Sequence, residues 1–175
     1  MKVEVSLNNS ITMSHTLHIQ PSSTKEETYI SLLPQLKGLL EREDDMIANY
    51  ANISAALKQA FNFFWTGFYI VKKDELVLGP FQGTIACTRI KYGKGVCGTA
   101  WKEKRTVIVE DVNQFPGHIA CDAASQSEIV IPLFSQKNDV IAVLDIDSEH
   151  LNHFDETDAL YLQQITRLLE EKITI

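Results

Sequence analysis

The residues best suited to chemistry in this chain are its three cysteines, Cys87, Cys97 and Cys121. Cys87 lies near the end of a predicted strand, whereas Cys97 and Cys121 lie in loops bounded by glycine or proline. A buried cysteine is often a small apolar side chain, but a thiolate is a nucleophile and a metal ligand. Because a helix is predicted from about residue 95, its N-terminus is expected to favour the thiolate form of Cys97.

The stretch KYGKGVCGTAW around Cys97 contains the glycines Gly93, Gly95 and Gly98 in the spacing of a dinucleotide-binding loop. Such a loop needs an acidic residue about 20 positions further on, at the end of the next parallel strand. Here the following predicted strand already ends at residues 110–111, and the neighbouring hairpins favour an antiparallel sheet. The glycines therefore indicate a turn around a thiol rather than a cofactor loop.

A metal site is the alternative use of the same thiols. Together with His118, the residues Cys87, Cys97 and Cys121 would supply a Cys₃His ligand set. Zinc sites usually contain closely spaced ligand pairs, and only His118 with Cys121 resembles one. We predict no metal, and a zinc-bound interaction module stays an alternative.

Composition narrows the class of protein. The chain has 175 residues, 45% of them hydrophobic, and a formal net charge of -7. This size suits one domain, and the negative charge argues against nucleic acid or an anionic membrane as a partner. We find neither an apolar stretch of about 18 residues nor a signal peptide, so we expect a cytoplasmic protein. An odd number of cysteines argues against a static disulfide framework.

The pattern of the chain predicts an α+β fold. Residues 1–22 show no sustained period and are interpreted as an N-terminal extension, and 23–175 as the domain. Thr24 and Glu27 form a capping box that begins a helix, which we expect Pro34 to kink or split.

The rest of the chain is expected to form further helices, two hairpins and additional strands. The expected elements are a helix at 44–60, a hairpin turning at 72–75 with a third strand, a helix at 95–104, a strand near 107, a hairpin turning at 137–139, and a helix capped by Asp155. Adjacent strands between terminal helices predict an antiparallel sheet of about six strands.

Acidic and aromatic side chains lie on the predicted strands. Asp145 and Asp147 are two apart, so they face the same side of a strand, and Glu128 opens an apolar run. Acids at strand ends are usually solvated, but a carboxyl beside core residues must be hydrogen-bonded or protonated. Trp65 and Tyr69 also share a face, where they would ordinarily form sheet core.

Six stretches carry a family resemblance: WTGFY, LGPFQGTIACTRI, GKGVCGTAW, HIACD, SEIVIPL and VLDIDS. Together they resemble the free methionine-R-sulfoxide reductases, which are single GAF domains. The resemblance covers about residues 25–172, and the three cysteines stand at the family's separations of 10 and 24 residues. It implies a GAF-like fold, a central antiparallel sheet flanked by N-terminal and C-terminal helices.

The resemblance implies an enzyme that reduces free L-methionine-R-sulfoxide. Cys121 would form the sulfenic acid, Cys87 would resolve it into a disulfide, and Cys97 would be a second resolving or relay thiol. The family does not fix this division of labour. No bound cofactor is implied; an external dithiol such as thioredoxin, fed indirectly by NADPH, would reduce the disulfide.

The resemblance also implies a substrate pocket. Trp65 would hold the methyl end of the substrate with Tyr69 beside it, and Glu128, Asp145 and Asp147 would bind the ammonium group or protonate the sulfoxide oxygen. Which carboxyl does which stays open, as does the oligomeric state, for which a homodimer is considered. The alternative function is a noncatalytic GAF domain that senses a small molecule.

Overall fold

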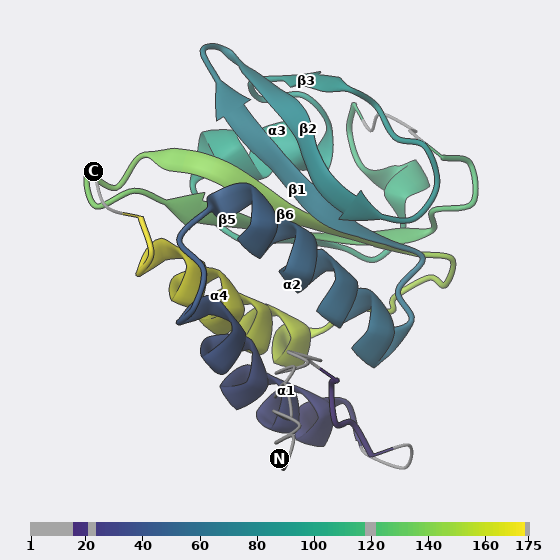
Figure 1. Ribbon diagram of the computed structural model, residues 1–175. Helices are drawn as coiled ribbons and strands as arrows, with labels where there is room; N and C mark the ends of the chain where they lie inside the picture. Colours follow the sequence, from purple (N-terminus) through teal and green to yellow (C-terminus); the bar gives the residue numbers. More distant parts are fainter. Residues whose placement is uncertain (1–15, 21–23, 118–121, 174–175) are drawn as a thin grey trace, which may run out of the picture.

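The computed structural model describes residues 16–20, 24–117 and 122–173, and a curled antiparallel sheet forms their centre (Figure 1). Within these residues the sheet has six strands in the order β3-β2-β1-β6-β5-β4, so that β1 and β6 form its middle. The strands are β1 (Trp65–Lys72), β2 (Glu75–Gln82), β3 (Arg89–Lys91), β4 (Val107–Val109), β5 (Ser127–Phe134) and β6 (Val140–Ser148).

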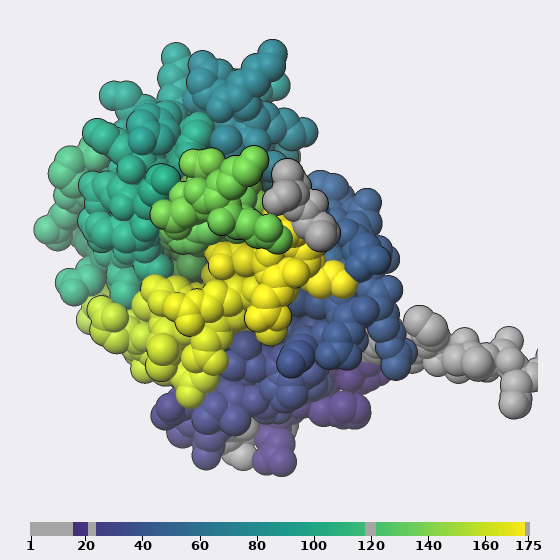
Figure 2. Space-filling model, turned by 90° about the vertical axis from the view of Figure 1, so that its left-hand side faces the viewer, coloured from purple at the N-terminus to yellow at the C-terminus, as the bar shows by residue number. Residues whose placement is uncertain are grey.

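Helices cover both faces of this sheet. Helices α1 (Lys25–Leu40), α2 (Met46–Phe61) and α4 (Glu156–Glu170) lie on one face, and α3 (Gly95–Glu103) lies on the other (Figure 1). A short 3₁₀ helix, η1 (Val112–Gln114), follows β4. From the side, the yellow residues of α4 lie between the blue N-terminal helices and the green and teal strands (Figure 2).

Short polar side chains begin the helices at the predicted places. The Thr24 hydroxyl accepts a hydrogen bond from the Glu27 amide, and the Glu27 carboxylate accepts one from the Thr24 amide. Asp155 caps α4 as expected. Of the two outcomes expected at Pro34, the split is wrong, because α1 runs without a break through Pro34, and the kink stays a prediction. Leu32 and Leu36 on either side are fully buried, and this tertiary packing compensates for the hydrogen bond that proline cannot donate.

The two faces of the sheet carry two separate hydrophobic cores. Alternate residues such as Phe68, Leu144 and Ile131 are buried against α1, α2 and α4. The residues between them point to the opposite face, where Tyr69 and Val143 are buried in the core that includes α3. The first core consists mainly of aliphatic and aromatic side chains, with a few buried polar ones on the helices, such as Asn49, Ser54 and Asp158, whereas Glu128 and Asp145 lie on the second face.

The predicted α+β fold with a central antiparallel sheet is confirmed, including both hairpin turns. The domain boundary at residue 23 stays a prediction, since residues 1–15 and 21–23 lie outside the described part. In the described residues 16–20, the His18 carbonyl accepts hydrogen bonds from Ser31 and Gln35 of α1. Every described helix is too short or too polar to cross a lipid bilayer.

Gly67 on β1 makes a close contact that a larger residue would prevent. A Cβ built on Gly67 would lie 2.4 Å from Cβ of Phe81 and 2.6 Å from Cη2 of Trp65. We expect Gly67→Ala to lower the free energy of unfolding by about 1–3 kcal/mol, because either the strand that carries Phe81 or the indole of Trp65 must shift. Urea denaturation followed by circular dichroism measures the change.

Gly38→Ala is the matched control. Gly38 lies exposed in α1, and a Cβ built there meets nothing within 4 Å. This substitution should leave stability unchanged or raise it by up to about 1 kcal/mol, since alanine favours helix. Equal destabilisation by both substitutions would contradict the close contact at Gly67.

Candidate functional site

Strand register brings the predicted site residues onto one face of the sheet. Asp147 on β6 lies opposite Trp65 of β1 on one side and opposite Glu128 of β5 on the other. Asp145, two residues earlier, lies opposite Gly67 of β1. The predicted shared face of Asp145 and Asp147 is therefore correct, and Glu128 joins them from the neighbouring strand.

The aromatic residues form a wall beside these acids. The rings of Trp65 and Tyr69 stack at 6.0 Å between centroids, and Phe81 stacks on Trp65 at 5.3 Å. Trp65 Nε1 donates a hydrogen bond of 3.1 Å to the Thr84 carbonyl, and the Tyr69 hydroxyl donates one of 2.9 Å to the Cys87 carbonyl. Trp65 and Tyr69 are thus both core residues and anchors for the segment that carries Cys87.

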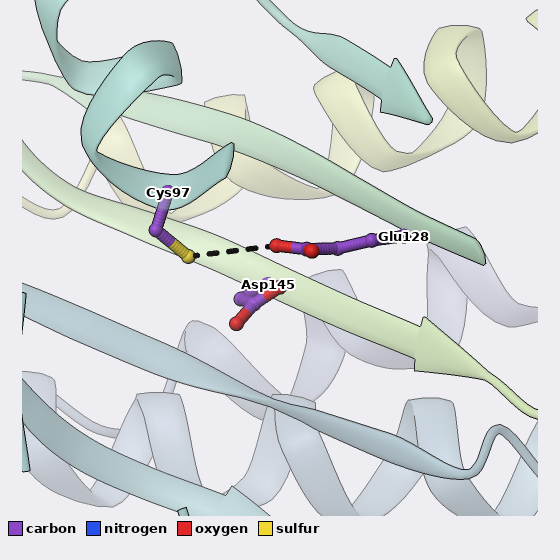
Figure 3. Close-up of side chains that lie close together, drawn as sticks. All are labelled: Cys97, Glu128 and Asp145. Carbon is purple, nitrogen blue, oxygen red and sulfur yellow. Dashed lines mark hydrogen bonds between the residues drawn. The ribbon is translucent and has the colours of Figure 1, made fainter. Parts of the chain in front are cut away.

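The glycine-rich stretch forms the tight start of α3. The Gly93 amide donates to the Gly98 carbonyl at 3.0 Å. A Cβ at Gly98 would lie 2.5 Å from the Lys91 carbonyl oxygen, so only glycine fits this approach. These residues serve packing within the loop, and Cys97 becomes the third residue of α3 with its side chain directed toward the sheet (Figure 3).

Cys97 lies against the carboxyl groups and is almost completely buried. Its Sγ is 3.9 Å from Oε1 of Glu128, and Asp145 lies beside both (Figure 3). The prediction that the helix N-terminus favours a thiolate here is wrong. Burial raises the pKa of Cys97 well above its usual value, and the charges of Asp145 and Glu128 raise it further. Cys97 is therefore a protonated thiol in this environment.

The three carboxyl groups hold protons more tightly than ordinary acids do. Burial raises the pKa of Glu128 well above its usual value, with further contributions from Asp145 and Asp147. Burial and the charge of Asp145 raise the pKa of Asp147 in the same direction. Burial raises the pKa of Asp145 to about 6. The acids therefore share protons near neutral pH, instead of being solvated anions at a strand end.

One oxygen of this cluster lacks a partner. Asp145 is 6% exposed, and its Oδ1 has no hydrogen bond within the described residues. A buried carboxyl oxygen without a partner costs free energy unless a ligand or water satisfies it. The arrangement therefore suits a hydrogen-bond donor or a cation that enters from the cavity.

Acids, thiol and aromatic wall line one cavity of about 550 Å³, including its mouth. An aromatic wall that faces a few polar groups is the usual lining of a small-molecule site. At its edge the Thr84 hydroxyl donates a hydrogen bond of 2.8 Å to the Asp122 carboxylate, which joins two loops. The lining residues are Phe64, Trp65, Tyr69, Thr84, Ile85, Ala86, Ile90, Gly95, Val96, Cys97, Asp122, Ser125, Glu128, Asp145 and Asp147.

The structure describes two of the three cysteines. Cys97 is a free thiol. Cys87 is disulfide-bonded and lies at the edge of the segment that lines the cavity. Cys121 and His118 lie outside the described residues, so the roles predicted for them stay predictions. Because a disulfide-bonded sulfur is not a thiolate, Cys87 in this state does not supply the zinc ligand that the alternative requires.

Sequence reasoning missed the residues that close the cavity. Thr84, Asp122 and Ser125 line it, yet none lies on a strand or in a recognisable catalytic spacing. The signal available for Asp122 was its position directly after Cys121 in HIACD. Its hydrogen bond to Thr84 joins residues far apart in the chain, which no local pattern predicts.

Comparison with known proteins identifies the family. A family model described as GAF domain matches residues 50–173. GAF domain-containing protein A of Dictyostelium discoideum is 60% identical over 159 residues, which cover 90% of this chain and 99% of that protein. The free methionine-R-sulfoxide reductase of Escherichia coli (strain K12) is 48% identical over 148 residues, 84% of this chain and 89% of that protein.

The fold agrees with a solved structure of the same family. The X-ray structure of free methionine-R-sulfoxide reductase from Neisseria meningitidis in complex with its substrate has 53% sequence identity and a TM-score of 0.88, covering 91% of this chain and 95% of that chain. The chain belongs to the free methionine-R-sulfoxide reductase family of GAF domains. The family resemblance and the GAF-like fold expected from the sequence motifs are therefore confirmed.

The raised pKa of Asp145 predicts a pH-dependent stability effect. The folded state favours the protonated carboxyl, so its contribution is complete below pH 3.8 and is lost as pH rises through about 6. Asparagine stays neutral at every pH. We expect Asp145→Asn to match wild type in stability at pH 4 and to exceed it by up to about 3 kcal/mol at pH 8.

Chemical denaturation between pH 4 and pH 8 measures this difference. Asp139→Asn at the β5–β6 turn, where the side chain is 74% exposed, should change stability by less than about 0.5 kcal/mol throughout. A gain at Asp145→Asn that is the same at both ends of the pH range would contradict the shared-proton cluster.

Proposed function

We propose that this chain reduces free L-methionine-R-sulfoxide to methionine through a cysteine sulfenic acid and an intramolecular disulfide. The observation that carries the proposal is the cavity, which combines an aromatic wall, the buried carboxyls of Glu128 and Asp145, the half-buried carboxyl of Asp147 and an adjoining segment with the disulfide-bonded Cys87. The relatives named free methionine-R-sulfoxide reductase support this reaction.

The cavity suits a single amino acid. Thr84 and Asp122 both line it and are hydrogen-bonded to each other at its edge, an arrangement that favours a free amino acid over a peptide chain. In our proposal the methyl end of the substrate contacts Trp65. The substrate ammonium donates to Oδ1 of Asp145, which otherwise has no partner.

Substrate binding then redistributes the protons of the acid cluster. A positive ammonium group lowers the pKa of the nearest carboxyl, which we take to be Asp145, and that group becomes an anion. Glu128 and Asp147, whose pKa values burial raises well above the usual range, keep a proton between them. One of these two carboxyls protonates the sulfoxide oxygen while the bond to sulfur breaks.

The thiol steps balance as follows. The Cys121 thiolate attacks the sulfoxide sulfur and forms a bond between Sγ and that sulfur. The oxygen, which takes up one proton, then passes from the substrate sulfur to Sγ as the bonds of the substrate sulfur to oxygen and to Sγ break, so that methionine leaves and Cys121 becomes a sulfenic acid. The Cys87 thiol condenses with it, releasing water and forming a disulfide. An external dithiol such as thioredoxin, supplied indirectly from NADPH, reduces that disulfide and is itself oxidised. A pool of such dithiols maintains the cycle in the cytoplasm, and no bound cofactor takes part.

Single-turnover experiments test the order of the thiols. Fully reduced protein without added reductant should convert up to one equivalent of the R epimer and none of the S epimer. We expect Cys121→Ser to form no methionine, Cys87→Ser to form one equivalent and leave a trappable sulfenic acid, and Cys97→Ser to retain the reaction. Chromatography of methionine and mass spectrometry of the protein measure both products.

Two results would overturn parts of this proposal. Methionine formation by Cys121→Ser would exclude Cys121 as the attacking thiol. Absence of turnover with either epimer by the reduced wild-type protein, under conditions where it binds the sulfoxide, would favour a noncatalytic sensor.

Ile85 tests how the reductant reaches the disulfide. This side chain is 92% exposed and lies two residues before Cys87 at the mouth of the cavity. A protein reductant that attacks there must cover Ile85, whereas dithiothreitol need not. We expect Ile85→Glu to raise the KM for thioredoxin at least about tenfold, since a charge would be buried.

Steady-state turnover with thioredoxin and with dithiothreitol distinguishes a loss of docking from damage to the cavity. Turnover with dithiothreitol should not change for Ile85→Glu, and Ile47→Glu, a 54% exposed position on α2, is the control. Equal losses with both reductants would show that the substitution damages the cavity instead of the docking contact.

A further inference from the structure

Cys97, Glu128 and Asp145 bring three potential metal ligands together inside the cavity. One ligand atom from each residue lies within 4.8 Å of the other two, and all three residues are buried (Figure 3). They come from α3, β5 and β6, so the rigid sheet and the packed helix hold them in place. The proposed reduction uses Asp145 to bind substrate and Glu128 or Asp147 to supply a proton, but it requires neither the Cys97 thiol nor a metal.

The separation of the atoms suits a small divalent cation. Zinc binds thiolate sulfur at about 2.3 Å and carboxylate oxygen at about 2.1 Å, so a tetrahedral site separates sulfur from oxygen by about 3.6 Å. The distance from Cys97 Sγ to Glu128 Oε1 is 3.9 Å. A shift of a few tenths of an ångström would bring this pair to the tetrahedral separation, and the other two pairs lie within 4.8 Å.

A second observation points to a ligand at this place. Among the residues that the structure describes, the buried Oδ1 of Asp145 has no hydrogen-bond partner, and the side chain reaches the same space as the thiol of Cys97 (Figure 3). A bound cation would satisfy this oxygen. One thiolate with two carboxylates matches zinc or cadmium, whereas calcium takes 6–8 oxygen ligands and magnesium an octahedron of oxygens.

We propose that Cys97, Glu128 and Asp145 form an inhibitory site for zinc or a similar thiophilic divalent cation, which excludes the substrate from the cavity. Binding is reversible and not a redox step. The cation enters with water as a further ligand, and the protons of the thiol and of any protonated carboxyl leave to solvent. The inhibition rests on the proposed function, whereas the binding site does not.

Cadmium titration tests the binding directly. Oxidised wild-type protein, in which Cys87 is disulfide-bonded and Cys97 is a free thiol, is titrated with cadmium while the thiolate charge-transfer absorption is followed. We expect one equivalent to bind. Glu128→Gln and Asp145→Asn should each weaken binding at least tenfold, and Glu149→Gln, at an exposed position, should leave it unchanged.

The thiol variants decide whether Cys97 is the sulfur ligand. Cys97→Ser should abolish the absorption, and Cys97→Ala serves if the serine variant does not fold. A band that survives in a folded Cys97 variant, or equal cadmium affinity in wild type, Glu128→Gln and Asp145→Asn, would overturn the site. So would the absence of any band in folded wild-type protein.

Competition links the site to activity. Free L-methionine-R-sulfoxide should displace cadmium, and zinc should raise the apparent KM for the sulfoxide without changing kcat. If the protein has no reductase activity, the absorption titration still tests the site, so the two failures are distinguishable. Cadmium binding that the sulfoxide does not weaken would refute the exclusion of substrate.

Discussion

β6 is hydrogen-bonded to β1 along one edge and to β5 along the other, and the register of both pairings determines what the cavity contains. It brings Asp145 and Asp147 onto the face that carries Trp65, and turns Leu144 and Ile146 toward the helices. A slip of β6 by one residue would exchange these sets, with carboxyl groups in the apolar core. The apolar face therefore enforces the position of the acids, because that error would be very costly.

Gathering the buried Glu128 and Asp145 with the half-buried Asp147 on one face has a cost in stability that the rest of the structure must offset. The folded protein holds these carboxyls partly protonated, so their contribution to stability declines toward neutral pH. The opposite face also holds a buried acid, but Asp158 there accepts hydrogen bonds from Tyr29 and Lys25, so its charge is paired. Functional sites often keep polar groups that only a bound ligand satisfies, and the protein is less stable as a result.

Local chemistry made much of the fold predictable, because caps, hairpin turns and alternation act over a few residues. The capping box at Thr24 and the shared face of Asp145 and Asp147 follow from such spacings. The raised pKa of Cys97 does not follow from local spacing, because the burial that mainly causes it, and the charges of Asp145 and Glu128 that add to it, depend on tertiary packing. The unbroken helix at Pro34 likewise depends on tertiary packing. The roles of the cysteines were inferred from the family motifs, because spacing alone does not assign them.

The hydrogen bonds of the aromatic wall connect the rings that line the cavity to the segment that carries Cys87. Trp65 and Tyr69 each donate to a backbone carbonyl of the segment from Thr84 to Cys87. In the proposed cycle, a displacement of Cys87 between its thiol and disulfide states would be transmitted through these hydrogen bonds to the two rings. Thermodynamic linkage would make that coupling reciprocal: a molecule bound at the wall would shift the reduction potential of the disulfide by the same free energy by which the oxidation state of Cys87 changes the affinity for that molecule.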